Sequence, residues 1–315
     1  MLIPTWFIIG FLSVLIGVIG SFFDKYLLKK YFGSDESSSG AGALIIFSAF
    51  FLYILIPFLL VFGEGKIDFS LGVGTVGFIS GVLSCLWILL YLHALSRVDV
   101  SQAIPVFQTI PIFGLVLGYL FFGEMLTFEQ FTAAVVILLG AHILLKNKEG
   151  ISGGSGRTTL LLMLSSSFFV ALSQVVFKVA AVDVNFWTAL FWNWVGFVFL
   201  GFVLYVSVKQ YRLQFRGLLR KRISALSKIY SVSAVNEIFD ITSDALLLGA
   251  VILGPVALVQ SVNAYEPFLT LAFGFILVKS IPKYFESDFS KATLHQKIIG
   301  ITIITLGSLI LYTSF

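Results

Sequence analysis

Hydrophobic residues run along the chain in ten continuous stretches that are separated by short polar segments. A bilayer core about 30 Å thick needs roughly 20 helical residues at about 1.5 Å each, and each stretch is close to that length. The stretches lack period-two alternation, which excludes a closed β-barrel and predicts helices. The expected spans cover residues 5–23, 43–63, 72–93, 101–122, 128–145, 159–181, 185–207, 230–251, 256–278 and 297–314.

Composition supports a membrane protein. Hydrophobic residues make up 58% of the 315 residues and charged residues 11%, and the mean hydropathy of +1.03 lies well outside the range of soluble globular chains. The net charge of +4 is expected to mark cytoplasmic loops rather than a nucleic-acid partner. The predicted fold class is therefore an all-α polytopic membrane protein with ten transmembrane helices.

Lysine and arginine residues are distributed one-sidedly. The odd-numbered connections hold nearly all of the 20 basic residues, whereas the even-numbered connections and both termini hold only Lys66, and Lys178 falls within a span. Because basic residues mark the cytoplasmic side, we expect the odd-numbered connections to face the cytoplasm and both termini to lie outside a plasma membrane. No basic segment precedes residues 5–23, which favours a retained anchor over a cleaved signal peptide.

The seventh connection combines basic and apolar residues. Arg212, Arg216 and Arg220 recur at helical spacing, and neighbouring leucines offer an apolar counterpart. The segment is either a helix that lies along the membrane surface or an ordinary basic loop. The sequence favours the loop.

The two halves of the chain share a pattern, because residues 97–120 align with residues 253–276. Five helices per copy make the second copy enter the membrane from the other side, and such inverted repeats commonly support alternating access around a site near the midplane. We expect a first repeat over residues 1–149, a flexible Gly/Ser-rich cytoplasmic linker over 150–158 and a second repeat over 159–315. The aligned pairs are Pro111 with Pro267, Gly118 with Gly274 and Gly140 with Gly307.

Three sequence blocks carry a resemblance to a known family. Residues 94–111 (ALSRVDVSQAIPVFQTIP) and 118–127 (GYLFFGEMLT) resemble the signature of EamA-type transporters of the drug/metabolite transporter superfamily, and residues 254–267 (GPVALVQSVNAYEP) repeat it. The resemblance covers nearly the whole chain. It implies a permease: a secondary transporter of small metabolites with a central cavity between its halves. Lys279 and Ser280 replace the Gly-Glu124 pair of the first half, so the resemblance implies no symmetric role for Glu124.

Several acidic residues lie deep in the predicted spans, where an ion that faces lipid costs several kcal/mol. Glu237, Asp240 and Asp244 are three and four residues apart and share one helix face, with Asp240 near the midplane. Carboxylates this close repel one another, so at least one is expected to carry a proton near neutral pH unless a cation or water intervenes. The predicted proton-coupling residues are Glu237, Asp240, Asp244 and Glu266.

Lys178 is a basic residue that lies well inside a span. It is the natural counter-charge to the carboxylates, and it could instead contact a carboxylate or phosphate of the substrate. Two structural alternatives are a permanent pair with an aspartate and an ammonium that reaches the nearby outer surface.

The ninth span carries polar residues at three-residue steps directly before a proline, and the fourth span has a glutamine and a proline at the corresponding level. A kinked, partly unwound segment would expose carbonyls to a ligand. In the alternative, the polar side chains satisfy the carbonyl that the proline frees and bind nothing. The predicted helix breaks are Pro111 and Pro267, and the predicted substrate-binding residues are Lys178, Asp240, Asn263, Glu266, Gln260, Gln108 and Asn193.

Other polar and aromatic residues are expected to be structural. Trp192 and Trp194 could form an aromatic ledge beside Asn193, but packing or interfacial anchoring is favoured. The single cysteine, Cys85, excludes an intramolecular disulfide and is expected to pack. Asp24 and Lys25 are expected to form an interfacial pair, or else to gate a cavity. The histidines, which lack the spacing of metal ligands, are His93, His142 and His295.

These observations predict a carrier that moves a small polar, amino-acid-like metabolite across the plasma membrane by alternating access. Proton coupling is expected from the buried carboxylates, and export follows from the family resemblance. The expected partners are a small-molecule substrate, protons and membrane lipid, with no cofactor, metal or nucleic acid. The alternative is a flippase for a lipid or lipid-linked sugar. An intramembrane enzyme is disfavoured because Asp240 and Asp244 lie on one helix, and the absence of a P-loop disfavours ATP hydrolysis.

Overall fold

The computed structural model describes residues 4–32, 39–63, 66–98, 100–123, 127–145, 154–220, 223–280 and 291–313. Within these ranges the chain is built of helices and contains no strand, which confirms the all-α class.

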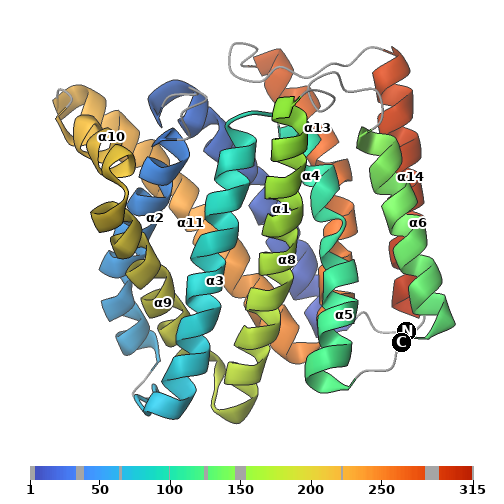
Figure 1. Ribbon diagram of the computed structural model, residues 1–315, viewed down its shortest axis with the longest axis horizontal. Helices are drawn as coiled ribbons and strands as arrows, with labels where there is room; N and C mark the ends of the chain where they lie inside the picture. The colour runs from blue at the N-terminus through green and yellow to red at the C-terminus, as the bar shows by residue number, and fades with distance from the viewer. Residues whose placement is uncertain are drawn as a thin grey trace.

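Helices of the first half follow the predicted spans (Figure 1). The first helix continues into a π-helical turn at Leu28–Phe32, so it extends beyond the predicted span of residues 5–23. The predicted span 101–122 is two helices rather than one. The helices are α1 (Thr5–Leu27), α2 (Ser39–Phe62), α3 (Leu71–Leu95), α4 (Val100–Phe107), α5 (Ile110–Phe122) and α6 (Phe128–Leu145).

The described part of the second half contains one α-helix more than that of the first half. Helix α10 occupies the seventh connection, which the sequence favoured as a loop, and packs against α2 and α9. A 3-10 turn at Val262–Tyr265 divides the predicted span 256–278. The helices are α8 (Gly154–Asp183), α9 (Phe186–Ser207), α10 (Lys209–Leu219), α11 (Ile223–Leu253), α12 (Val256–Ser261), α13 (Glu266–Ser280) and α14 (Lys291–Thr313).

Among the residues that the structure describes, five helices are long and apolar enough to cross a membrane. The other predicted spans are helical as well. Some of these helices are broken or short, and α11 carries three carboxylates. The number of ten crossings therefore stays a prediction. The five segments are Thr5–Phe32, Gly40–Phe62, Gly74–Leu95, Arg157–Val182 and Phe186–Ser207.

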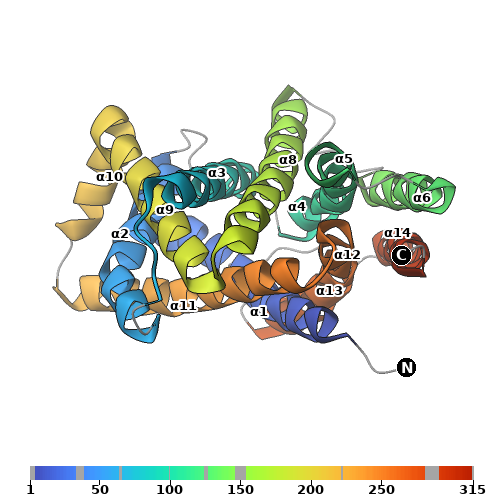
Figure 2. The same ribbon diagram turned by 90° about the horizontal axis from the view of Figure 1, so that it is seen from below.

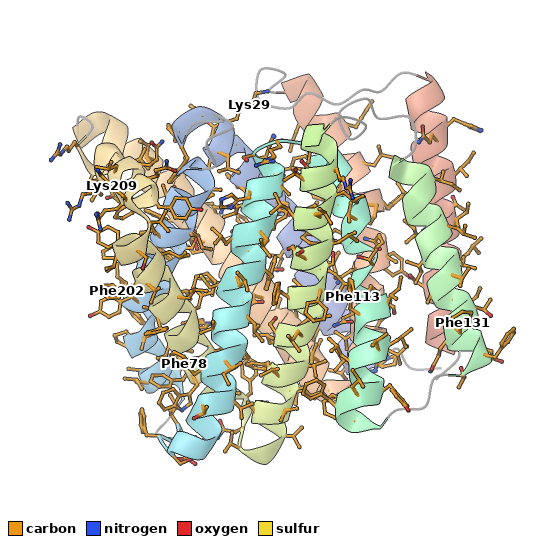
Figure 3. All side chains as sticks on the ribbon, viewed as in Figure 1. Lys29, Phe78, Phe113, Phe131, Phe202 and Lys209 are labelled. Atoms are coloured by element: carbon orange, nitrogen blue, oxygen red, sulfur yellow. The ribbon has the colours of Figure 1, made fainter. Side chains whose placement is uncertain are left out.

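The helices stand side by side with both chain ends at the same end of the bundle (Figure 1). Lys29 and Lys209 lie toward the opposite end (Figure 3), which is the geometry that the basic connections predict. Helix α3 packs along α8 and α9, and α1 packs along α11. Helices α6 and α14 form a pair at one edge (Figure 2). The aligned Gly140 and Gly307 both lie at this α6–α14 contact.

Helices α3 and α9 touch through their backbones. A Cβ atom at Gly81 would lie 1.8 Å from the carbonyl oxygen of Asn193, so only glycine fits there. Small residues of this kind allow close helix approach in membranes. The contact fixes Asn193 in α9 against α3, where its amide donates to the hydroxyls of Ser80 and Ser84.

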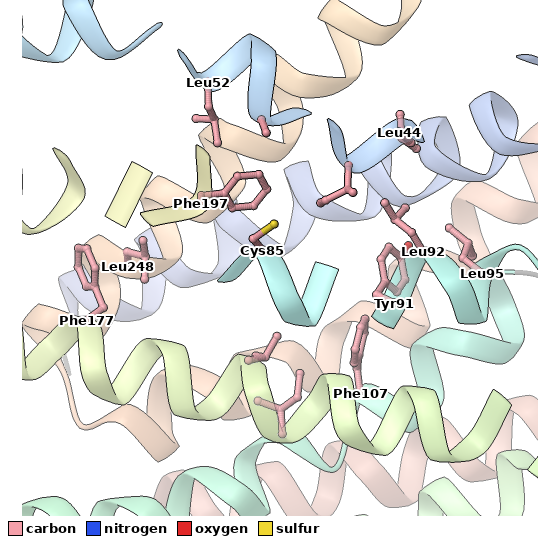
Figure 4. Packing of buried hydrophobic residues seen from close by; sticks show 14 of the residues in the cluster. Leu44, Leu52, Cys85, Tyr91, Leu92, Leu95, Phe107, Phe177, Phe197 and Leu248 are labelled. Carbon is pink, nitrogen blue, oxygen red and sulfur yellow. The ribbon is translucent and has the colours of Figure 1, made fainter. Parts of the chain in front are cut away.

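Cys85 lies in the main apolar core, fully buried, with its sulfur beside the ring of Phe197 (Figure 4). It packs as the sequence predicts. Tyr91 and Phe107 form part of the same core, with ring centroids 5.4 Å apart. This core joins helices of both halves.

Several predicted features fall outside the described parts of the chain. Helix α8 begins at Gly154, so residues 154–158 of the expected linker are helical, whereas residues 150–153 are not described. Glu124 also lies outside the described ranges, as do the side chains of His142 and Lys279.

Candidate functional site

A central cavity of about 180 Å³ lies among helices of both halves, including α1, α2, α3, α8, α9 and α11. Its wall carries five carboxylates, and no lysine, arginine or histidine is among the described residues that line it. An intramembrane ionisable group is a candidate functional group by default, and this cavity gathers five of them. The carboxylates are Asp24, Glu237, Asp240, Asp244 and Glu266.

Helix α11 contributes three of these carboxylates because their three- and four-residue spacing places them on one face. Glu237 is buried and accepts a hydrogen bond from the hydroxyl of Ser48, with 2.5 Å between Oγ and Oε1. This bond attaches α2 to the carboxylate-bearing face of α11. Asp240 and Asp244 follow along the same cavity wall.

Asn236 joins two of the carboxylates. Its Nδ2 donates to Asp24 Oδ1 over 2.9 Å and to Asp240 Oδ2 over 2.8 Å. Asp24, expected to be a gate or an interfacial residue, is thus a member of the cavity cluster. Sequence spacing could not reveal this, because Asp24 comes from α1 and meets Asp240 only through tertiary packing.

The packing of α1 on α11 sets the depth of the carboxylates. The hydroxyl of Ser13 donates to the carbonyl of Ser243 over 2.8 Å, and the hydroxyl of Ser243 donates to the carbonyl of Ser13 over 2.9 Å. Two turns further along α1, Gly20 lies directly against Asp240. Small and hydroxyl side chains therefore hold the two helices close beside the cavity.

The two broken helices meet next to the cavity. Helix α5 begins at Ile110 and carries Pro111 in its first turn, and α13 carries Pro267 in its first turn. Gln108, in the first break, donates from Nε2 to the carbonyl oxygen of Asn263, in the second, over 3.0 Å. A carbonyl released by one break is therefore satisfied from the other, which is the structural role considered for these residues.

The polar residues of the ninth span do not share one environment. Asn263 and Glu266 line the cavity, but Gln260 does not. Gln260 is fully buried and donates from Nε2 to Gln174 Oε1 over 2.9 Å, and Gln174 lines the cavity. The structure thus places Gln260 behind the wall, where it supports Gln174.

Asn193 and Trp194 line the cavity, whereas Trp192 does not. The indole of Trp192 donates from Nε1 to the carbonyl of Asp68 over 3.0 Å. The two tryptophans therefore do not form a common ledge.

The two lysines predicted near the site do not line the cavity. Lys178 donates to the carbonyl oxygen of Gly254 over 2.6 Å and lies 5.7 Å from the ring centroid of Phe122. Lys25 is buried and donates to the carbonyls of Leu95 and Val98 over 2.8 and 2.9 Å, which caps the end of α3. Both ammonium groups thus hydrogen-bond helix-terminal carbonyls.

Neither His93 nor His295 lines the cavity. His93 contacts α10 through Tyr211, with 3.0 Å between Nε2 and the hydroxyl, and His295 is exposed. Among the residues that the structure describes, no group of three or more histidine, cysteine or acidic side chains could hold a metal ion.

Comparison of the sequence with models of protein families finds one similar family. The model of the EamA-like transporter family matches residues 4–146. The resemblance to EamA-type transporters is confirmed. The family suggests a membrane transporter of the drug/metabolite type rather than an enzyme.

Comparison by structure extends to the whole chain. One solved crystal structure is similar with a TM-score of 0.62 and 15% sequence identity, over 97% of this chain and 96% of the other. At that identity the likeness shows the fold alone. A search of curated proteins found no match.

Proposed function

We propose that this EamA-type chain is a secondary active transporter that moves a small polar metabolite by alternating access, with protons as the coupling ion. The observation that carries the proposal is the central cavity, whose wall combines five carboxylates with side chains from both halves. Transporters of this kind bind their substrate near the midplane between two repeats. A cavity shared by both halves can change its access when one half moves against the other.

The proposal includes two inverted five-helix repeats, residues 1–149 and 159–315, joined by the 150–158 segment. The paired breaks before Pro111 and Pro267 support it, as does the contact of α6 with α14. The backbone hydrogen bonds are already interrupted at the breaks, so a helix can bend there without losing further backbone hydrogen bonds. The hydrogen bond from Gln108 to the carbonyl of Asn263 joins the two breaks.

The amide shared by two carboxylates supports the proposal of proton coupling. The amide nitrogen of Asn236 donates a hydrogen bond to Asp24 and another to Asp240. Two carboxylates held this close repel each other in a low-dielectric site. A proton on one of them relieves the repulsion, and binding of substrate changes the protonation of the two carboxyl groups. Asp24, Asp240 and Glu266 are the proposed proton carriers. We propose export across a plasma membrane with both termini outside, on the family resemblance and the basic connections.

A flippase for a lipid or lipid-linked sugar is the second candidate. An apolar groove of about 810 Å³ runs between α2 and α9, and Arg216 lies beside it with its Nε donating to the hydroxyl of Tyr205 over 3.0 Å. The groove and the carboxylate cavity share no lining residue. A lipid phosphate in the cavity would meet carboxylates and no basic side chain among the described lining residues, so the carrier is the better-supported function.

Thermal stability of the purified protein tests the proposal against a panel of amino acids, nucleotide sugars, organic cations and isoprenoid-phosphate lipids. A ligand at about 100 times its dissociation constant stabilises the native state by roughly 2.7 kcal/mol. Stabilisation by a soluble metabolite, lost in Asp240→Asn, supports the carrier. A response to the lipids alone supports the flippase.

Transport in proteoliposomes tests the coupling. The compounds that stabilise the protein are presented under an imposed pH gradient to wild type, Asp240→Asn, Glu266→Gln and the control Glu129→Gln, whose side chain is exposed on α6. We expect the control to accumulate substrate like wild type and both cavity variants to lose pH-driven accumulation. Full accumulation in both cavity variants would remove Asp240 and Glu266 from the coupling mechanism.

A further inference from the structure

The cavity wall has a uniform sign of charge. It carries five carboxyl groups, and no basic side chain is among the described residues that line it. The hydrogen bonds that the structure gives to Asp24, Asp240 and Glu237 come from neutral donors, the amide of Asn236 and the hydroxyl of Ser48. A carboxylate or phosphate on a ligand would therefore meet repulsion in this cavity, whereas an ammonium group would find several acceptors.

We infer that the substrate of the proposed carrier is a small aliphatic amine in its cationic form, bound with its ammonium group between the carboxylates of α1, α11 and α13. This inference rests on the proposed function and names its substrate class. It departs from the amino-acid-like substrate that the sequence suggests, because a zwitterion brings a carboxylate for which the described residues of the wall include no positive partner.

A second and independent observation is the hydroxyl of Tyr91. Tyr91 lines the cavity and is 4% exposed. Its hydroxyl interacts with that of Ser21, another lining residue, but makes no hydrogen bond of acceptable distance and angle within the described parts of the chain. Buried polar groups are almost always hydrogen-bonded. A hydroxyl left without a partner on the wall of a cavity indicates a ligand that supplies one, and an ammonium group can donate to its oxygen.

The rest of the wall suits the alkyl part of such a cation. Aromatic rings gather at the cavity, where the Phe107 centroid lies 5.4 Å from that of Tyr91 and 6.3 Å from that of Trp87. Aromatic faces attract ammonium groups and pack against methylene chains. The aromatic lining residues are Trp87, Tyr91, Phe107, Trp194 and Phe197.

Cavity size limits the ligand. The volume of about 180 Å³ lies below the roughly 300 Å³ at which pockets for drug-sized molecules begin. A short mono- or diamine therefore fits the inference better than a large lipophilic cation.

Three four-carbon compounds test the charge preference at constant chain length: butane-1,4-diamine, 4-aminobutanoate and butanedioate. Their affinities for the purified protein are measured by calorimetry at pH 7, with ethidium as a large cation. We expect the diamine to bind at least tenfold more tightly than 4-aminobutanoate, and butanedioate and ethidium not to bind. Equal or tighter binding of 4-aminobutanoate or butanedioate would overturn the inference.

Variants locate the binding. Asp244→Asn and Glu266→Gln, on separate helices, should each weaken diamine affinity by tenfold or more, so one of them suffices if the other does not fold. Tyr91→Phe should weaken it severalfold, and Glu129→Gln should leave it unchanged. Unchanged affinity in Asp244→Asn and Glu266→Gln, with both folded, would place the diamine elsewhere and defeat the inference.

Transport separates this inference from the proposed function. Uptake of 4-aminobutanoate without uptake of the diamine would overturn the cationic substrate and leave the carrier standing. Diamine binding without movement of any compound across the membrane would support the cationic site and contradict the carrier.

Discussion

Gly20 on α1 lies directly against Asp240 on α11. A Cβ atom at Gly20 would lie 2.0 Å from Asp240 Oδ1, a distance that no side chain can occupy. The carboxylate at the centre of the cavity wall therefore depends on the absence of a side chain in the neighbouring helix. The reciprocal hydrogen bonds of Ser13 and Ser243 hold the same two helices together.

Gly20→Ala should displace Asp240 and impair the site. We expect substrate affinity to fall at least tenfold and the free energy of unfolding to fall by about 1–3 kcal/mol, as for overpacked sites. Gly10→Ala, on the same helix, is the matched control, because its Cβ would meet Val262 at an ordinary 3.7 Å. Alanine there should keep stability or raise it by up to about 1 kcal/mol. Thermal unfolding and ligand binding distinguish the two, and equal behaviour of the variants would contradict the close contact.

Asn236→Ala should destabilise the pair of carboxylates that this amide joins. Hydrogen bonds to charged groups contribute about 1.5–3 kcal/mol, so we expect Asn236→Ala to lower the free energy of unfolding by at least about 1.5 kcal/mol. Thr242→Ala, on an exposed position of the same helix, should stay within about 0.5 kcal/mol of wild type.

A double-mutant cycle of Asn236→Ala with Asp24→Asn measures the interaction itself. Residues in one hydrogen-bond network show interaction energies of about 0.5–3 kcal/mol. Additive effects in this cycle would show that the amide does not act on Asp24.

The alignment of the three carboxylates on α11 could be predicted from the sequence because it depends on the geometry of a single helix. Spacing of three and four residues places Glu237, Asp240 and Asp244 on one face whatever the helix packs against, and the structure places all three on the cavity wall. Asp24 could not be predicted in the same way. Its approach to Asp240 depends on how α1 packs on α11, and residue spacing in a single sequence does not indicate which helices pack together.

The ninth span shows why helical spacing fails across a break. Gln260, Asn263 and Glu266 follow at three-residue steps and would lie near one another on a regular helix. The chain changes from α-helix to 3-10 helix at Val262, and the rotation per residue changes with it. As a result Asn263 and Glu266 line the cavity while Gln260 lies behind it.

Tyr211→Phe should weaken the attachment of α10 to α3. The carbonyl of Leu89 can only accept, so the Nδ1 of His93, 2.6 Å away, carries the proton, and in the neutral ring Nε2 accepts from the hydroxyl of Tyr211. Removal of that hydroxyl should cost about 0.5–1.5 kcal/mol. The ring itself packs over Gly42 and stays in place. Tyr53→Phe, at an exposed position, is the control and should not change thermal stability.

Alkaline pH provides a second measurement on the same residue. Burial raises the pKa of Tyr211 above its ordinary value. The native state then holds this proton more tightly than the unfolded state, so stability is complete below the ordinary tyrosine pKa of about 10 and falls as pH rises through the higher native value. The difference in stability between wild type and Tyr211→Phe should be constant from about pH 7 to 9 and shrink as the pH rises from about 10 through the native pKa. A difference that shrinks below pH 9 would contradict this sign.

Lys178 offers a direct comparison of charge and hydrogen bonding. The sequence suggests a counter-charge to the carboxylates, but the ammonium group donates to the carbonyl of Gly254 and does not line the cavity. Lys178→Met should therefore lower the free energy of unfolding by about 1–3 kcal/mol, since a buried carbonyl loses its charged donor, and should change substrate affinity less than twofold. Lys178→Gln retains an amide donor and should recover part of the stability. A tenfold change of affinity, or loss of pH-driven transport in both variants at retained stability, would return Lys178 to the role of counter-charge, because neither effect follows from a hydrogen bond at the end of α11.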